Sequence, residues 1–136
     1  MNILNNEIQN IINVLNLRIT VKDFEDLVFS NKIDFEYISK NILLSEEFIE
    51  KFKDKINWEW LSQYQELSEE FIEKHKDEVN WDYISVYQKL SEQFIEKFKD
   101  KVNWYGISEY QKLSEKFIEK FQDKINWISI SRRQAL

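Results

Sequence analysis

The sequence predicts an all-α protein, a right-handed α-solenoid with two short helices in each 23-residue repeat and an N-terminal helical cap. A fixed period of about 20–50 residues is typical of a stacked array. The apolar residues within each period are spaced i, i+3 and i+4, which favours helices over strands. The period itself is set by a pair that returns every 23 residues, at Asn57-Trp58, Asn80-Trp81, Asn103-Trp104 and Asn126-Trp127.

Residues 1–32 depart from this pattern and are predicted to form the cap and a degenerate first helix. Terminal repeats are expected to be atypical because one of their faces meets water. Thr20, with Asp23 three residues later, is a good start for the second helix of the cap. A first helix over about residues 3–17 is indicated by one apolar face, formed by Leu4, Ile8, Ile11 and Leu15.

Residues 33–136 are predicted to hold the tandem repeats, and one of them serves as the example. Ser68 is a good N-cap for a first helix, and Asn80 is a good N-cap for a second. Helices this short are marginal when isolated, so packing on neighbouring repeats must stabilise them. The apolar stripes of the two helices are Phe71, Ile72 and His75 in the first, and Trp81, Ile84 and Tyr87 in the second.

The segment Leu90-Ser91-Glu92-Gln93-Phe94-Ile95-Glu96-Lys97-Phe98-Lys99-Asp100-Lys101-Val102-Asn103-Trp104 resembles a known short helical repeat. Such repeats, about 23 residues long, are abundant in proteins of giant DNA viruses and occur in some phage and bacterial proteins. The resemblance covers about residues 33–136. It implies a solenoid and a viral or phage origin, and it implies no catalytic function or substrate.

Composition excludes several classes of function. The 136 residues carry 19 Lys and Arg against 25 Asp and Glu, a net charge of −6, so a basic nucleic-acid footprint is not expected. The absence of cysteine excludes disulfides and thiolate chemistry, and a single glycine, Gly106, excludes a glycine-rich phosphate loop. No apolar run reaches the roughly 18 residues of a membrane span, and no cationic leader begins the chain. The expected location is therefore the cytoplasm, that of the host if the source is a virus or phage.

The residues that carry chemistry elsewhere have structural interpretations here. His75, the single histidine, takes the place of Phe52, Phe98 and Phe121 in other repeats, which indicates a packing position. The repeated glutamates start helices, the repeated serines lack a base, and the Asn-Trp tryptophans lie on the core register. We therefore expect no enzyme, no catalytic residue, no cofactor and no metal site.

A partner-binding surface is predicted from the positions that vary between repeats, all of them in the second helix. Three columns of equivalent positions vary: Glu36, Glu59, Asp82, Tyr105 and Ile128; then Tyr37, Trp60, Tyr83, Gly106 and Ser129; and then Lys40, Gln63, Val86, Glu109 and Arg132. The first and third columns lie four residues apart and so share one helical face. Tyrosine, tryptophan and arginine, which occur there, often carry binding energy. An equally simple interpretation is that solvent-facing positions drift. The predicted partner-binding residues are Glu36, Tyr37, Glu59, Trp60, Gln63, Asp82, Tyr83, Val86, Tyr105 and Glu109.

These features favour a non-enzymatic module that binds a partner protein, without direct nucleic-acid or membrane contact. The alternative is a viral or phage inhibitor of host defence, of the anti-CRISPR kind, that blocks a nucleic-acid-binding protein through its acidic surface. The last repeat is also more apolar than the others, which suggests a homodimer around a two-fold axis. The predicted dimer interface is Phe121, Trp127, Ile128 and Arg132.

Overall fold

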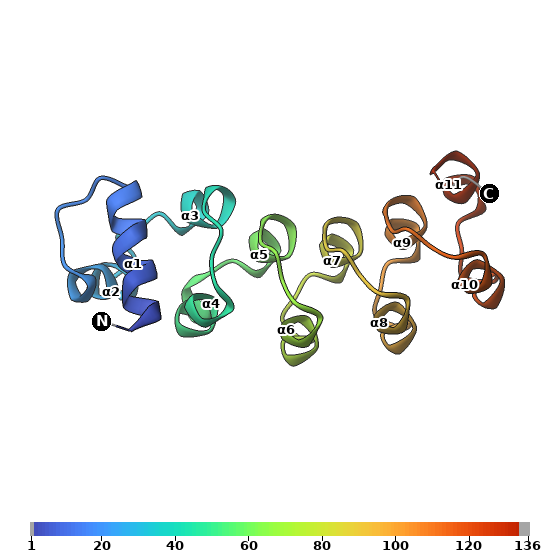
Figure 1. The fold of residues 1–136 in the computed structure, drawn as a ribbon, viewed down its shortest axis with the longest axis horizontal. Helices are drawn as coiled ribbons and strands as arrows, with labels where there is room; N and C mark the ends of the chain where they lie inside the picture. The colour runs from blue at the N-terminus through green and yellow to red at the C-terminus, as the bar shows by residue number, and fades with distance from the viewer. Residues whose placement is uncertain (1, 134–136) are drawn as a thin grey trace. The chain divides into compact units, whose positions relative to one another are not determined.

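The structure is a computed structural model that describes residues 2–133, and over this range it has eleven α-helices, one short 3-10 helix and no strand (Figure 1). The all-α prediction is confirmed. Two compact units, Met1–Gln65 and Glu66–Leu136, divide the chain and are described separately. Unit 1 holds α1 (Ile3–Val14), α2 (Val21–Phe29), α3 (Phe35–Asn41), α4 (Glu46–Phe52), η1 (Lys53–Lys55) and α5 (Trp58–Tyr64). Unit 2 holds α6 (Glu69–Lys74), α7 (Trp81–Tyr87), α8 (Glu92–Lys97), α9 (Trp104–Tyr110), α10 (Glu115–Lys120) and α11 (Trp127–Arg133).

Helix α1 is three residues shorter than the sequence predicts. It ends at Val14 because Asn16 takes a left-handed conformation, with φ 56°, and asparagine tolerates this conformation better than most residues. Leu15 consequently lies past the helix and is only partly buried. The predicted start of α2 is confirmed, since Thr20 and Asp23 form a capping box.

The core of unit 1 is a cluster of phenylalanine rings. Phe24 from α2 packs against Phe48 and Phe52 from α4, with ring centroids 6.4 and 6.2 Å apart. All three rings are fully buried. The cap also makes a polar contact with the first repeat, because the Glu7 carboxylate accepts hydrogen bonds from the amide and the hydroxyl of Ser45. The cap is thereby bonded directly to the N-cap of α4.

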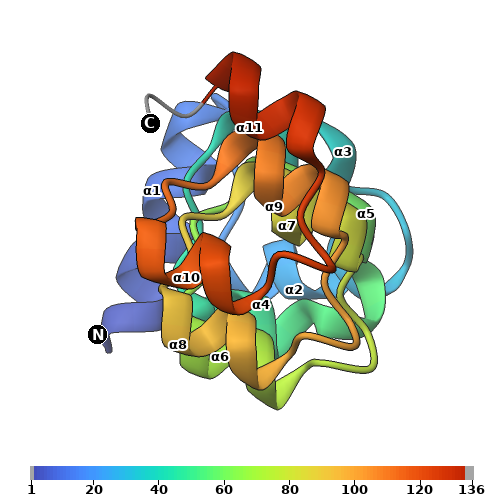
Figure 2. The same cartoon turned by 90° about the vertical axis from the view of Figure 1, so that its right-hand side faces the viewer.

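In unit 2 the helices alternate between two rows. Helices α7, α9 and α11 lie side by side in one row, and α6, α8 and α10 lie in the other (Figures 1 and 2). We call α3, α5, α7, α9 and α11 the odd repeat helices, and α4, α6, α8 and α10 the even repeat helices. The even helices begin after a serine N-cap at Ser45, Ser68, Ser91 and Ser114. Four of the odd helices begin after an Asp or Asn N-cap, at Asp34, Asn57, Asn80 and Asn103, and Asn126 bonds the first turn of α11 in the same way.

A buried glutamine joins successive repeats in each unit. In unit 1 the Gln65 side chain accepts a hydrogen bond from the Leu44 amide and donates to the carbonyls of Ser39 and Ile42. In unit 2 the Gln111 side chain accepts from the Leu90 amide at 3.1 Å. It also donates to the carbonyls of Ser85 and Gln88 at 2.9 and 2.6 Å. Each glutamine therefore satisfies backbone groups at a helix C-terminus and in the loop that follows it.

The tryptophans that open the odd helices are less buried than their register predicts. Trp81 and Trp104 are half-buried, and Trp127 is 50% exposed. Their indole N–H groups donate to the carbonyls of Lys76, Lys99 and Gln122, and this polar contact keeps one edge of each ring at the surface. Within residues 2–133, no helix is long and apolar enough to cross a membrane.

Candidate functional site

Exposed aromatic side chains gather on the odd repeat helices. Throughout the described range, the four even repeat helices expose no large apolar side chain, whereas the odd ones expose seven. Tyr64, Tyr87 and Tyr110 recur one period apart, each at the end of an odd helix. The remaining four are Tyr37, Tyr105, Trp127 and Ile128. In each unit, therefore, the odd helices form the exposed aromatic face of the described repeats.

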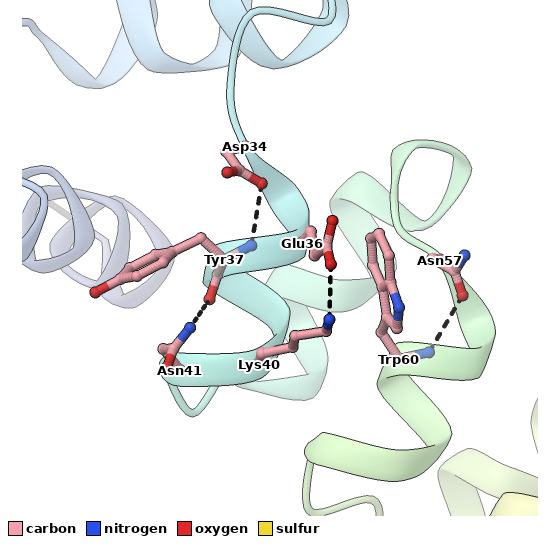
Figure 3. Close-up of polar contacts among 7 residues, drawn as sticks. All are labelled: Asp34, Glu36, Tyr37, Lys40, Asn41, Asn57 and Trp60. Atoms are coloured by element: carbon pink, nitrogen blue, oxygen red, sulfur yellow. Dashed lines mark hydrogen bonds and ion pairs between the residues drawn. The ribbon is translucent and has the colours of Figure 1, made fainter.

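In unit 1 this face centres on Lys40, between α3 and α5 (Figure 3). The Lys40 Nζ lies 2.7 Å from a carboxylate oxygen of Glu36, one helical turn earlier. The same ammonium lies 5.3 Å from the ring centroid of Trp60 and 5.7 Å from that of Tyr64. Helix α5 presents Trp60 at this place because Asn57 caps its amide. A cation that contacts two aromatic rings orders this part of the surface.

The hydrogen bond that Lys40 donates to the Glu36 carboxylate raises the pKa of Lys40 above the ordinary lysine value. Lys40 therefore keeps its charge at neutral pH, and it is unsuited to act as a general base. The cluster offers two aromatic rings that contact one ammonium group, with the paired Glu36 carboxylate beside it. This arrangement is suited to recognising another polar surface.

Other predicted residues of unit 1 do not converge on that cluster. Figure 3 shows the Tyr37 ring pointing away from Trp60, although its amide is capped by Asp34. Glu59 is exposed and Gln63 is half-buried. The structure therefore brings together Glu36 and Trp60 from the prediction, and adds Tyr64.

In unit 2 the predicted column around residue 106 packs between helices. Gly106 is buried where α9 crosses α7, and an added Cβ would lie 3.1 Å from the Cγ2 of Val86 and 3.2 Å from the Cβ of Ser85. Val86 and Tyr83 are half-buried, and the Tyr83 ring packs on Tyr87, with centroids 6.0 Å apart. Variation in this column therefore reflects helix contact as well as exposure.

Two predicted residues pair with each other between α9 and α11. Glu109 is only 9% exposed, and its carboxylate lies 2.9 Å from the Arg132 guanidinium. This hydrogen bond, with a further one to Tyr105, raises the pKa of Arg132 above its ordinary value. Glu109 thus helps to hold α9 and α11 together, and little of its side chain is accessible to a partner. Tyr105 and Asp82 are exposed, and Asp82 accepts a hydrogen bond from the Asn103 amide group at 2.8 Å.

The residues of the predicted dimer interface are spread between core and surface. Phe121 is buried, with its ring centroid 5.3 Å from that of Trp104. Trp127 is half-exposed and Ile128 is 76% exposed. The dimer stays a prediction, and Ile128 is the residue that best fits it.

His75 is 3% exposed and packs on the Phe71 ring, so its predicted packing position is confirmed. The buried serines have a role that the sequence did not indicate. The Ser85 hydroxyl donates to the Trp81 carbonyl at 2.7 Å and accepts from the Asn103 amide at 2.9 Å. Among the described residues, no group of three His, Cys, Asp or Glu side chains is placed to hold a metal ion.

Sequence reasoning missed the recurring tyrosines and glutamines of the odd helices. Tyr64-Gln65, Tyr87-Gln88 and Tyr110-Gln111 share the 23-residue register, and that repetition is the signal that marks them. Comparisons with family models, curated proteins and solved structures gave no match for this chain.

Proposed function

We propose that this chain is a non-enzymatic module that binds a partner protein through its odd repeat helices. The supporting observation is the difference between the two kinds of helix: the odd ones expose Tyr64, Tyr87 and Tyr110, and the even ones expose charged and amide side chains. Tyrosine gives a large rigid contact area and a hydroxyl that hydrogen-bonds, and it is enriched where binding energy concentrates. The order of the Lys40 cluster reduces the entropy that would be lost on binding.

The source and the kind of partner belong to the same proposal. The repeat resembles those of giant DNA viruses and phages, and from this likeness we infer a viral or phage source. An inhibitor that copies the charge of nucleic acid is the alternative. Its binding would fall steeply with salt, whereas binding anchored by aromatic rings changes much less.

The test uses two triple variants as baits to capture proteins from the host cell of the inferred virus or phage. The first is Tyr64→Ser, Tyr87→Ser and Tyr110→Ser. The matched control, on the even helices, is Glu70→Ser, Gln93→Ser and Lys116→Ser, which replaces three exposed residues at no change in net charge. We expect one protein to bind the wild type and the control and to be lost from the tyrosine variant. Equal binding to both variants would contradict the proposal, and loss of that protein between 0.1 and about 0.5 M salt would favour the acidic alternative.

A further inference from the structure

In unit 2, α8 and α10 each dock on the preceding repeat through the same aromatic contact. The Trp81 ring packs on Phe94 and Phe98 of the next even helix, with centroids 6.1 and 5.2 Å apart. Trp104 packs on Phe117 and Phe121 at 6.2 and 5.3 Å, and the interplanar angles agree to within a few degrees. The contact therefore follows a rule: one tryptophan receives two phenylalanines that are four residues apart.

Two carboxylates complete each docking contact. Glu92 accepts hydrogen bonds from the amide and the hydroxyl of Ser114, the N-cap of α10, at 2.6 and 2.9 Å. Glu96, one turn later on α8, pairs with Lys120 of α10. Glu69 and Glu73 of α6 bond to α8 in the same two ways. Each docked even helix is thus recognised by its N-cap serine, its lysine and its two phenylalanine rings.

Helices α10 and α11 present the same three groups one period later. Glu115, Glu119 and Trp127 are the equivalents of Glu92, Glu96 and Trp104, and they line a groove of about 250 Å³ together with Ile118 and Gln122. We call these five residues the α10–α11 groove. The Trp127 indole donates to the Gln122 carbonyl just as Trp104 donates to Lys99, which gives its ring the same orientation.

The groove is open within the described part of the chain. Trp127 is 50% exposed and has no aromatic ring against it from residues 2–133. In the same range, no serine or lysine bonds the Glu115 and Glu119 carboxylates, and both side chains are exposed. A groove that combines an acidic edge with an aromatic floor complements a helix that carries a cation and apolar rings.

We propose that the α10–α11 groove binds a short amphipathic helix of a partner protein with the pattern Ser-x-x-Phe-Ile-x-Lys-Phe. A folded second copy is a poor occupant, because its described even helices already bury these rings, as Phe94, Phe98, Phe117 and Phe121 show. The inference goes beyond the proposed function and uses a different surface. If binding through the odd repeat helices is disproved, binding of a helix in the α10–α11 groove can therefore still be tested, and the reverse also holds.

The probe is a synthetic peptide with the sequence of residues 113–126, labelled with fluorescein and titrated with the full chain. Anisotropy should show saturable binding on the order of 100 µM, since an isolated helix of this length must also be ordered on binding. A peptide with alanine at both phenylalanine positions should not bind. Binding that is equal for the two peptides, or absent up to about 1 mM, would overturn the proposal.

Variants of the chain locate the peptide. Trp127→Ala should weaken binding at least about tenfold, as removal of a central aromatic does, and Tyr87→Ser, on the odd-helix face, should leave it unchanged. Glu119→Lys should weaken binding about fivefold, and a peptide with Lys120→Glu should recover it. Circular dichroism checks that each variant stays folded.

Unchanged binding to Trp127→Ala would place the peptide elsewhere and overturn the proposal. Self-association that Ile128→Glu abolishes, without peptide binding, would assign this end to a second copy and overturn it as well.

Discussion

At the scale of single residues, the buried glutamines show how one side chain satisfies several backbone groups. The carbonyls of Ser85 and Gln88 and the amide of Leu90 all face the Gln111 side chain. The Ser85 carbonyl belongs to the last turn of α7, and the Gln88 carbonyl and Leu90 amide lie at its end and in the loop that follows, where the helix leaves backbone groups unpaired. An amide side chain fits them because it offers one acceptor and two donor hydrogens within a single planar group.

Gln111→Leu should lower the free energy of unfolding by about 3 kcal/mol. The substitution keeps the volume but leaves two carbonyls and one amide buried without this partner, at a cost of about 1 kcal/mol or more each. Urea unfolding followed by circular dichroism measures the loss. Gln122→Leu, at an exposed position, is the control and should change stability by less than about 0.5 kcal/mol. Equal stabilities for the two variants would show that the buried amide contributes little.

Gly106 permits the close approach of α9 to α7. An alanine there gains about 0.8–1 kcal/mol of helix propensity, but its Cβ meets Ser85 and Val86 at 3.2 and 3.1 Å. We expect Gly106→Ala to be near neutral. Gly106→Val, which adds two further methyl groups to a close-packed contact, should cost about 2 kcal/mol. Thermal unfolding of both variants measures these changes in stability. A stabilised valine variant would mean that α9 does not pack on α7 at this position.

At the scale of elements, local signals predicted the helices well. Ser91 and Asn103 cap helices that follow directly, and each cap bonds an amide only three residues away. The partners of the buried glutamines lie 21 to 26 positions away, so nothing near them in sequence marks their role. The exposure of Tyr87 was missed for a similar reason. Its i+6 spacing from Trp81 fits a helical stripe, yet contacts between helices place it 52% exposed.

The candidate site was also predicted only in part, because contacts within one helix can be read from the sequence and contacts between helices cannot. Glu36 and Lys40 are four residues apart on one helix, so their pairing can be read from the sequence. The contact of Lys40 with Trp60 joins two helices and depends on their packing. Variation between repeats predicted that Gly106 lies at the surface. At the crossing of α9 and α7, however, the residue type reflects how little space the two helices leave.

Trp104→Ala should destabilise the protein by about 3 kcal/mol, because the ring packs on Phe117 and Phe121 of the next even helix. Trp127→Ala should cost less than about 1 kcal/mol. Its ring is half exposed, and no described aromatic residue packs on it. Denaturant unfolding of both variants gives the comparison. Losses of equal size would mean that the stacking on α10 adds nothing to the stability of unit 2.

At the scale of the whole molecule, the bonds between repeats are local in sequence within each unit. The hydrogen bonds of the buried serines and glutamines join residues 18 to 26 positions apart. The cap adds two that span 38 positions, both between Glu7 and Ser45. Loops this short cost little entropy to close. Each repeat therefore forms most of its contacts with its immediate neighbours, as expected for a helical array.

Refolding should be complete within about a second at 25 °C, with its main phase in milliseconds or faster, because helical proteins with local contacts fold at such rates. The chain also contains no proline, so cis–trans isomerisation cannot add a phase of tens of seconds. Stopped-flow dilution from urea, followed by tryptophan fluorescence, tests both statements. Protein kept unfolded for one second or for one hour should refold at the same rate. A slow phase that grows with the time spent unfolded would show that peptide bonds isomerise in the unfolded chain even without proline. A main phase slower than about one second would show that non-local contacts limit folding, against the locality of the repeat.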